Sequence, residues 1–218
     1  MKPAILYYSL ISFCFSLSHK NIISLGKSVT IYGTMNANNV SVNTSIGANI
    51  EFSYGKSLGI EFRPALSRLK GRFRNIYLNI GFSQGGFLKK NIHPLVNYEV
   101  RKIYKINYFR SAFIYPFPSL IRKLKICSGL YLGIPISGKI QAVRGGFIQP
   151  DSKLKNSYLK NDIGIVFMIK YPLNSHISFR TTLSYGINHS FDYTYEAYKA
   201  SNRVIGIGVS YLYGSKNK

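Results

Sequence analysis

Residues 161–189, NDIGIVFMIKYPLNSHISFRTTLSYGINH, decide the fold of this chain. Apolar residues occupy most alternate positions in two runs of this stretch: Ile163, Ile165, Phe167, Ile169 and Tyr171, then Ile177, Phe179, Thr181, Leu183, Tyr185 and Ile187. Because successive side chains of a strand point to opposite faces, each run predicts a strand with one apolar face and one polar face. The short link 172–175 joins the two strands as a hairpin.

The same alternation recurs along the chain. It is clear in 43–54, 58–66, 74–83 and 203–213, present on one face of 125–137, and weaker in 29–35. Residues 104–115 also predict a strand, although Arg110 and Ser111 interrupt both of its faces. Gly55, Lys56 and Ser57 predict a tight turn between the first two runs. No segment has a convincing helical period, so these nine candidate strands predict an all-β chain.

The polar faces of these strands are unlike a surface that meets water. They consist mainly of Gly, Ser, Thr and Asn with few charges, whereas roughly a quarter to a third of a soluble surface is charged. Small residues and paired charges suit the interior of a small barrel. The apolar faces are long enough for the roughly 9 to 11 residues that a tilted strand needs to cross a membrane. Tyr54, Tyr171, Tyr211 and Tyr213 end apolar faces, where aromatic girdles are expected.

The pattern therefore predicts an antiparallel up-and-down transmembrane β-barrel, with a soluble barrel or sandwich as the alternative architecture. Such barrels usually have an even number of strands, and we expect about eight, with roughly ten as the alternative. Either 29–35 lies outside the barrel, or 58–83 forms one interrupted strand plus loop, or a tenth strand is missed. An eight-stranded barrel has an interior filled by side chains. Long links at 85–102, 144–161 and 189–202 are expected on the outer side, and shorter links at 116–123 and 172–175 on the periplasmic side.

The first twenty residues, MKPAILYYSLISFCFSLSHK, have the order of a secretory signal: a positive charge, an apolar run and small residues. A core helix is the alternative interpretation. The predicted organisation is a signal peptide at 1–18, a lead-in at 19–42 that could hold the first strand, a barrel at 43–213 and a polar tail at 214–218. After cleavage the expected location is the outer membrane of a Gram-negative cell.

The chain has a formal net charge of +22, from 29 Lys and Arg against 7 Asp and Glu. Its basic residues are scattered, without the long blocks typical of a nucleic-acid-binding arm, so we expect no nucleic-acid partner. A basic barrel in a membrane favours anionic lipid head groups. We expect a monomeric barrel, with membrane lipids and envelope or secretion-system proteins as candidate partners.

The sequence contains little that predicts chemistry. His19, His93, His176 and His189 lack the spacing of metal ligands, and Cys127 is the single cysteine once the signal is removed, so we expect no metal, cofactor or disulfide. His189, Ser190 and Asp192 are the residue types of an acyl-transfer site. Neighbours on a strand diverge, however, and we expect no catalysis.

Charged residues on the polar faces form the best candidate site. They are Glu51, Glu61, Arg63, Asp162, Lys170 and Arg180. We expect them to form an ion-pair network that plugs the lumen, and the alternative is a narrow conduit lined by the same groups.

Four segments carry a family resemblance: SLGIEFRPALSRLKG (57–71), SGLYLGIPISGKI (128–140), residues 161–189 and the closing NRVIGIGVSYLYG (202–214). With these segments the chain resembles the PorT-like outer-membrane β-barrel family of the Bacteroidota, best at 162–164 and 183–187. The resemblance implies an eight-stranded barrel in a family of which some members are implicated in type IX protein secretion and gliding, and which has no established catalytic residues. The chain departs from the family in being Lys-rich and in continuing past Tyr213.

Three functions follow as hypotheses. The first is a non-enzymatic barrel that serves as a scaffold or as a component of a secretion or surface assembly. The second is a small porin-like solute channel, and the third is an outer-membrane lipid hydrolase.

Overall fold

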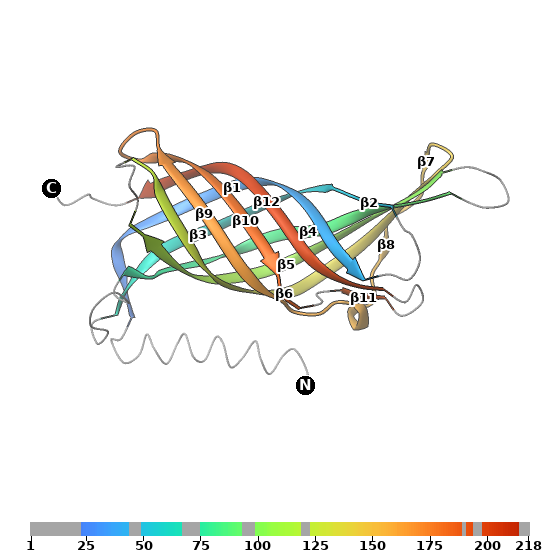
Figure 1. The fold of residues 1–218 in the computed structure, drawn as a ribbon, viewed down its shortest axis with the longest axis horizontal. Helices are drawn as coiled ribbons and strands as arrows, with labels where there is room; N and C mark the ends of the chain where they lie inside the picture. The colour runs from blue at the N-terminus through green and yellow to red at the C-terminus, as the bar shows by residue number, and fades with distance from the viewer. Residues whose placement is uncertain are drawn as a thin grey trace.

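The computed structural model describes residues 23–43, 49–66, 75–92, 99–118, 123–188, 191–193 and 198–213. Eight long strands form the barrel: β1 (Ile23–Asn43), β3 (Ser53–Leu66), β4 (Tyr77–Ile92), β5 (Glu99–Phe117), β6 (Lys125–Arg144), β9 (Asp162–Pro172), β10 (Ile177–Gly186) and β12 (Tyr198–Tyr213). Each pairs antiparallel with its neighbour along the chain, and β1 pairs with β12 to close the ring (Figure 1). The prediction of an eight-stranded antiparallel barrel is confirmed.

Smaller elements decorate one end of the barrel. They are β2 (Asn49–Glu51), β7 (Phe147–Ile148), β8 (Ser152–Lys153), β11 (Phe191–Tyr193) and the 3-10 helix η2 (Asn156–Tyr158). We call this end the loop end. The opposite end, where short links join β5 to β6 and β9 to β10 and where Tyr213 ends β12, is the turn end (Figure 1, left). No helix in the described ranges is long and apolar enough to cross a membrane.

The first barrel strand comes from the expected lead-in. β1 runs in register with the last strand, from Val29 opposite Tyr213 to Asn43 opposite Lys199. Residues 23–42 therefore belong to the barrel wall, whereas the predicted signal peptide (1–18) and polar tail (214–218) lie outside the described residues.

The predicted hairpin around Gly55 is wrong. Gly55, Lys56 and Ser57 lie inside β3, where they pair with Asn36, Met35 and Thr34 of β1. A Cβ on Gly55 would lie 2.6 Å from Asn38 Nδ2, so this glycine permits a close approach between side chain and backbone and does not form a turn. The runs 53–54 and 58–66 thus belong to a single strand, which reduces nine candidates to eight.

The predicted long loop at 85–102 is also wrong. β4 continues to Ile92 and pairs with β5 in unbroken register from Tyr77–Ile114 to Ile92–Glu99. Gly86 has a positive φ of 138°, but the pairing of β4 with β5 continues through it. Glycine suits this position because a Cβ there would clash with the Tyr104 carbonyl oxygen. β4, β5 and β6 consequently extend beyond the other strands as a tongue at the loop end (Figure 1, right).

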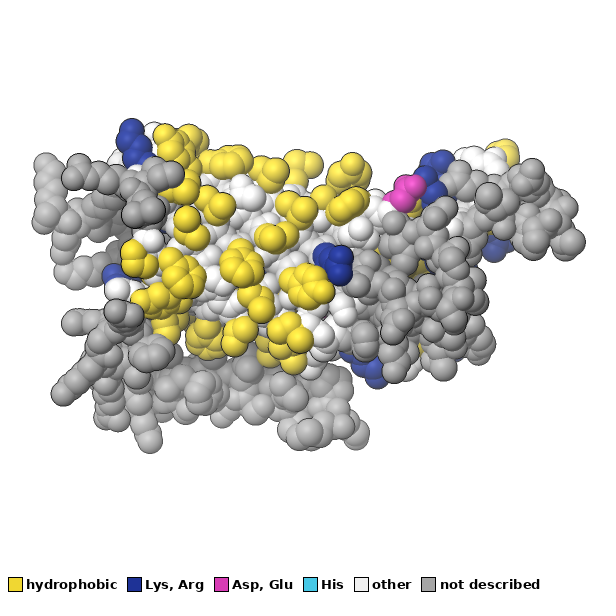
Figure 2. Space-filling model, viewed as in Figure 1, with side chains coloured by type: hydrophobic (Ala, Val, Ile, Leu, Met, Phe, Trp, Pro, Cys, Tyr) yellow, Lys and Arg dark blue, Asp and Glu magenta, His cyan; other side chains and the backbone are white. Residues whose placement is uncertain are grey.

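The outer surface of the barrel is apolar. Large side chains that are exposed on the wall come from every barrel strand: Met35, Leu58, Phe82, Phe113, Leu130, Phe167, Leu183, Ile207 and Val209 among others. Figure 2 shows apolar side chains spread over the barrel face in view, with few Lys or Arg side chains among them. We call this surface the apolar belt. On β4, β5 and β6 a row of hydrogen bonds borders it toward the loop end, from Gln84 to Asn107 (3.1 Å) and from Asn107 to Ser137 (2.9 Å).

The interior is more apolar than the sequence led us to expect. Ile114, Tyr131, Val166 and Met168, with Ala112 and Cys127, form a buried cluster on the inner faces of β5, β6 and β9. A second buried cluster at the loop end joins Phe87, Tyr104, Ile106 and Tyr108 to Leu154 and Leu159, which lie in the connection between β6 and β9. Sequence alternation had assigned Val166 and Met168 to a polar face. Their burial shows that one part of the lumen is packed like an ordinary core.

Candidate functional site in the barrel lumen

Three charged side chains meet inside the barrel near the turn end. One carboxylate oxygen of Glu61 forms an ion pair with Lys170 Nζ, and the other lies 3.2 Å from Arg180 Nη1. The side chains of Glu61 and Arg180 are almost fully buried, and that of Lys170 is 12% exposed. We call these three residues the ion-pair cluster.

The ladder of strands explains how the cluster forms. Lys170 of β9 and Arg180 of β10 are direct partners in register, so both point to the same face of the sheet. Glu61 comes from β3, which pairs with neither β9 nor β10. Because like charges directly opposite each other repel, the carboxylate of Glu61 compensates a pair that would otherwise be unfavourable. The cluster therefore ties together distant parts of the wall.

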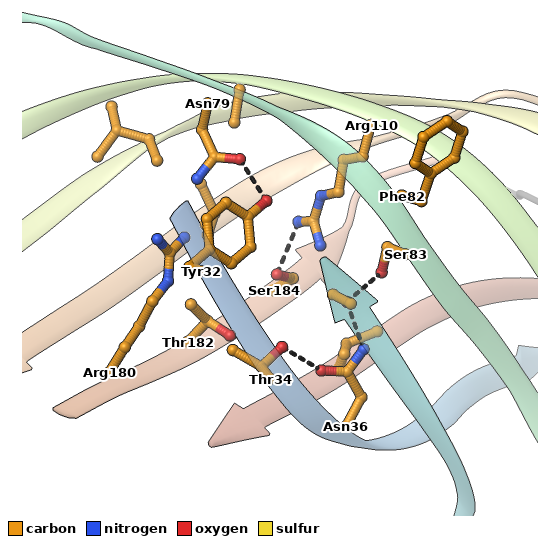
Figure 3. A pocket seen from close by; sticks show the side chains of 15 residues that line it. Tyr32, Thr34, Asn36, Asn79, Phe82, Ser83, Arg110, Arg180, Thr182 and Ser184 are labelled. Carbon is orange, nitrogen blue, oxygen red and sulfur yellow. Dashed lines mark hydrogen bonds between the residues drawn. The ribbon is translucent and has the colours of Figure 1, made fainter. Parts of the chain in front are cut away.

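Tyr32 of β1 extends the cluster toward the middle of the lumen. The Arg180 guanidinium lies 3.8 Å from the centroid of the Tyr32 ring, an arrangement that favours a cation–π interaction. The Tyr32 hydroxyl donates a hydrogen bond of 2.6 Å to Asn79 Oδ1 of β4 (Figure 3). Gly59 makes room for the ring, since a Cβ there would lie 2.4 Å from the Tyr32 hydroxyl oxygen.

A second polar layer crosses the middle of the barrel. Arg110 Nη2 donates to Ser184 Oγ at 2.7 Å, and its guanidinium lies 3.7 Å from the centroid of the Tyr131 ring. Across from it, Asn36 Nδ2 donates to Ser57 Oγ at 2.6 Å (Figure 3). The cavity between these side chains has a volume of about 30 Å³, and a single water needs a volume of roughly 10 to 15 Å³. This layer has space for no more than a few waters.

Asp162 organises a third layer toward the loop end. The Tyr131 hydroxyl lies 3.2 Å from both of its carboxylate oxygens and donates one shared hydrogen bond to them, and Asn202 Nδ2 donates to Oδ2 at 3.1 Å. Asn202 Nδ2 also lies 3.1 Å from the Tyr108 hydroxyl. Beyond this layer, on the side of β4 and β5, the second buried cluster packs against Leu154 and Leu159 of the β6–β9 connection. Along its length the described lumen is crossed by polar contacts, and packed apolar side chains follow on that side of the loop end.

The structure places the six predicted site residues in different parts of the molecule. Glu61, Lys170 and Arg180 come together, and Asp162 is buried in a separate layer. Arg63 lies exposed at the mouth of the turn end.

The placement of Glu51 in the lumen is wrong. Glu51 lies in β2, which pairs with the outer part of β4, and its exposed carboxylate is 2.5 Å from Lys90 Nζ. The alternation that assigned it an inner face assumed one strand over 43–54, and the structure divides that run among β1, β2 and β3.

Sequence reasoning did not assign Tyr32, Arg110, Tyr131 or Asn202 to the lumenal site. Arg110 carried a usable signal. It lies in step with Tyr104, Ile106, Tyr108 and Ala112, and the structure buries all four of these on the inner face of β5. An arginine that interrupts an apolar face is, in this strand, a lumenal cation.

The structure describes only one of the three residues of the hydrolase candidate. His189 and Ser190 lie outside the described residues, and Asp192 lies in β11. Within the described ranges no group of three His, Cys, Asp or Glu residues could hold a metal ion.

Comparison with known proteins finds similar solved structures at low sequence identity. No family model matches the chain, and no curated protein matches its sequence. Among solved structures it is similar to Neisserial surface protein A, with 14% identity over 85% of this chain and 97% of that chain and a TM-score of 0.40.

Two further structures are similar to the same extent. One is Ail, the attachment invasion locus protein of Yersinia pestis, in complex with the heparin analogue sucrose octasulfate, with 9% identity, coverage of 85% and 98%, and a TM-score of 0.43. The other is the E. coli outer membrane protein W, with 10% identity, coverage of 87% and 99%, and a TM-score of 0.40. At such identities the likeness transfers no activity to this chain.

Proposed function

We propose that this chain is an integral outer-membrane protein whose barrel has a closed lumen and serves as a non-enzymatic scaffold or component of a secretion or surface assembly. The observation that carries the proposal is the apolar belt. Ile207, Val209 and Leu183 are about half exposed, whereas Glu61 and Arg180 are buried. A barrel in water would have the opposite arrangement.

The extent of the belt supports a membrane environment. Soluble monomers rarely expose contiguous apolar patches larger than about 300–600 Å², whereas every barrel strand here contributes exposed Ile, Leu, Phe, Met or Val. Exposed tyrosines, Tyr211 and Tyr213 at the turn end and Tyr54 and Tyr185 toward the loop end, suit the two interfaces of a bilayer. The short links at the turn end are those expected on the periplasmic side.

The filled lumen supports a scaffold over a channel. The ion-pair cluster, the Arg110 layer and the Asp162 layer follow one another along the barrel, and the apolar loop-end cluster lies beyond them. A porin would need a continuous water-filled path. We infer that the predicted lumenal network acts as a plug.

A role in a secretion or surface assembly rests on the sequence resemblance and on the tongue. The tongue carries Phe147 and Ile148, which are 77% and 69% exposed beside a Gly145–Gly146 turn. Exposed apolar residues beyond the belt are candidate contacts for an envelope partner. We propose the PorT-like role on this basis.

Two measurements test the proposal. The full protein recovered from membrane fractions should migrate faster on a denaturing gel unheated than boiled, as closed barrels do. In planar bilayers it should give no stable ohmic conductance. A steady conductance would instead support the porin hypothesis. Hydrolysis of lipid A or phospholipid that is abolished by Ser190→Ala would support the hydrolase.

A further inference from the structure

The lumen widens at the turn end into a cup of about 210 Å³. Side chains from all eight barrel strands line it, and the ion-pair cluster contributes Glu61 and Lys170. Drug-sized ligands occupy pockets of about 300–1,000 Å³. The cup is therefore suited to a small ligand.

The charges around the cup are predominantly positive. Arg63, Lys125 and Lys170 line it, and Glu61 is the one acid among its described lining residues. The Glu61 side chain is 1% exposed and is already engaged by Lys170 and Arg180. Lys170 is the more exposed partner, so the cup meets the cation of this pair more than the carboxylate.

The cup also offers neutral hydrogen-bonding groups. Thr30, Ser178 and Ser210 contribute hydroxyls to its lining. Ammonium, guanidinium and hydroxyl donors together are the usual recognition groups for phosphate and carboxylate oxygens. A recess of one charge sign between low-dielectric walls also concentrates counter-ions.

We propose that the cup is a binding site for a small free oxyanion of the size of phosphate. Arg63 and Lys125 contact the anion at the rim, and Lys170 contacts it from the floor. This inference goes beyond the scaffold role, because a closed barrel with or without a bound anion would give the same gel shift and the same absence of conductance.

Titration of the purified full protein with inorganic phosphate, in a non-ionic detergent and followed by isothermal calorimetry, tests the proposal. We expect saturable binding that weakens at least fivefold in Arg63→Gln and in Lys125→Gln. The matched control is Lys56→Gln, because Lys56 is an exposed lysine of β3 that is absent from the cup lining. Its phosphate affinity should stay within twofold of the parent.

Each variant should retain the fast-migrating band of the folded barrel. This control shows that weaker phosphate binding is not caused by unfolding. Absence of saturable binding to the parent protein, or equal weakening in all three variants, would overturn the proposal. A second titration uses short-chain phosphatidic acid in the same micelles. If the lipid binds and the rim variants weaken it while free phosphate neither binds nor competes, the ligand is a lipid head group and the free-anion proposal fails.

Discussion

At the scale of single residues, Glu61 is the acid at the centre of the buried ion-pair cluster. It is almost fully buried and compensates both Lys170 and Arg180. Removing one partner of a buried ion pair is far more costly than removing an exposed one, because the remaining charges stay out of water without compensation.

We therefore expect Glu61→Gln to destabilise the barrel by about 3 kcal/mol or more. The matched control is Glu51→Gln, because the Glu51 carboxylate also pairs with a lysine but is 47% exposed. That change should cost less than about 1 kcal/mol. The destabilisation of each variant is measured by adding urea and following the loss of the fast-migrating band on an unheated gel. Equal midpoints for the two variants would contradict the importance of the buried cluster.

Gly59 gives a second residue-scale prediction. A Cβ at this position would lie 2.4 Å from the Tyr32 hydroxyl oxygen and 2.6 Å from the Ile80 carbonyl oxygen, so Tyr32 would have to move. Overpacking of this kind costs about 1 to 3 kcal/mol. Gly33→Ala is the control, because its nearest atoms are 4.0 Å away. We expect a lower urea midpoint for Gly59→Ala and little change for Gly33→Ala; the reverse order would be inconsistent with the packing around Tyr32.

At the scale of elements, the apolar belt makes a prediction that depends on depth. Ile207 lies in the middle of the outward series of β12, and Tyr54 lies near the loop-end margin on β3. A lysine on the lipid face costs about 2 to 4 kcal/mol at the bilayer midplane and about 0 to 1 near an interface. Ile207→Lys should therefore sharply reduce the folded fraction in lipid vesicles, and Tyr54→Lys should not. Similar yields for both would argue against a membrane-spanning belt.

The strands also show which elements could be predicted from sequence. β9 and β10 were correct to within two residues, because each alternates cleanly from its start to its turn. β12 was correct except for its first five residues, which had been assigned to the loop at 189–202. β3 and the outer part of β4 were not, because Gly55 and Gly85–Gly86 are typical of turns and the structure uses them inside strands. A glycine read without its cross-strand neighbour does not distinguish a turn from a close approach.

The same limit applies to the lumenal site. Lys170 and Arg180 lie on adjacent, well-predicted strands, so their meeting was accessible from the alternation. Their contact with Glu61, and that of Arg180 with Tyr32, depend on the curvature of the whole ring, which local alternation does not specify. The tongue and the apolar packing of the loop end also depend on which strands are extended.

At the scale of the whole molecule, closure by β1 and β12 is directly testable. Met35 and Ile207 are opposite each other across the seam, and both are exposed on the belt. The double variant Met35→Cys with Ile207→Cys, in a Cys127→Ser background, should form a disulfide on oxidation. After boiling without reductant, this cross-linked chain should migrate differently from its reduced form, and Met35→Cys alone should not. Failure to cross-link in the folded protein would mean that the seam is open.

The seam also brings the two ends of the described barrel to the same rim, with Val29 opposite Tyr213. Any strand of a closed ring can be the first in the chain. Because the two ends lie close together, they can be joined and the chain cut at another link, which is a circular permutation. The link between β9 and β10 lies at that same rim, so a circularly permuted chain opened there would start with β10 and finish with β9. The order in which strands leave the ribosome is thus separable from the order in which they stand in the wall.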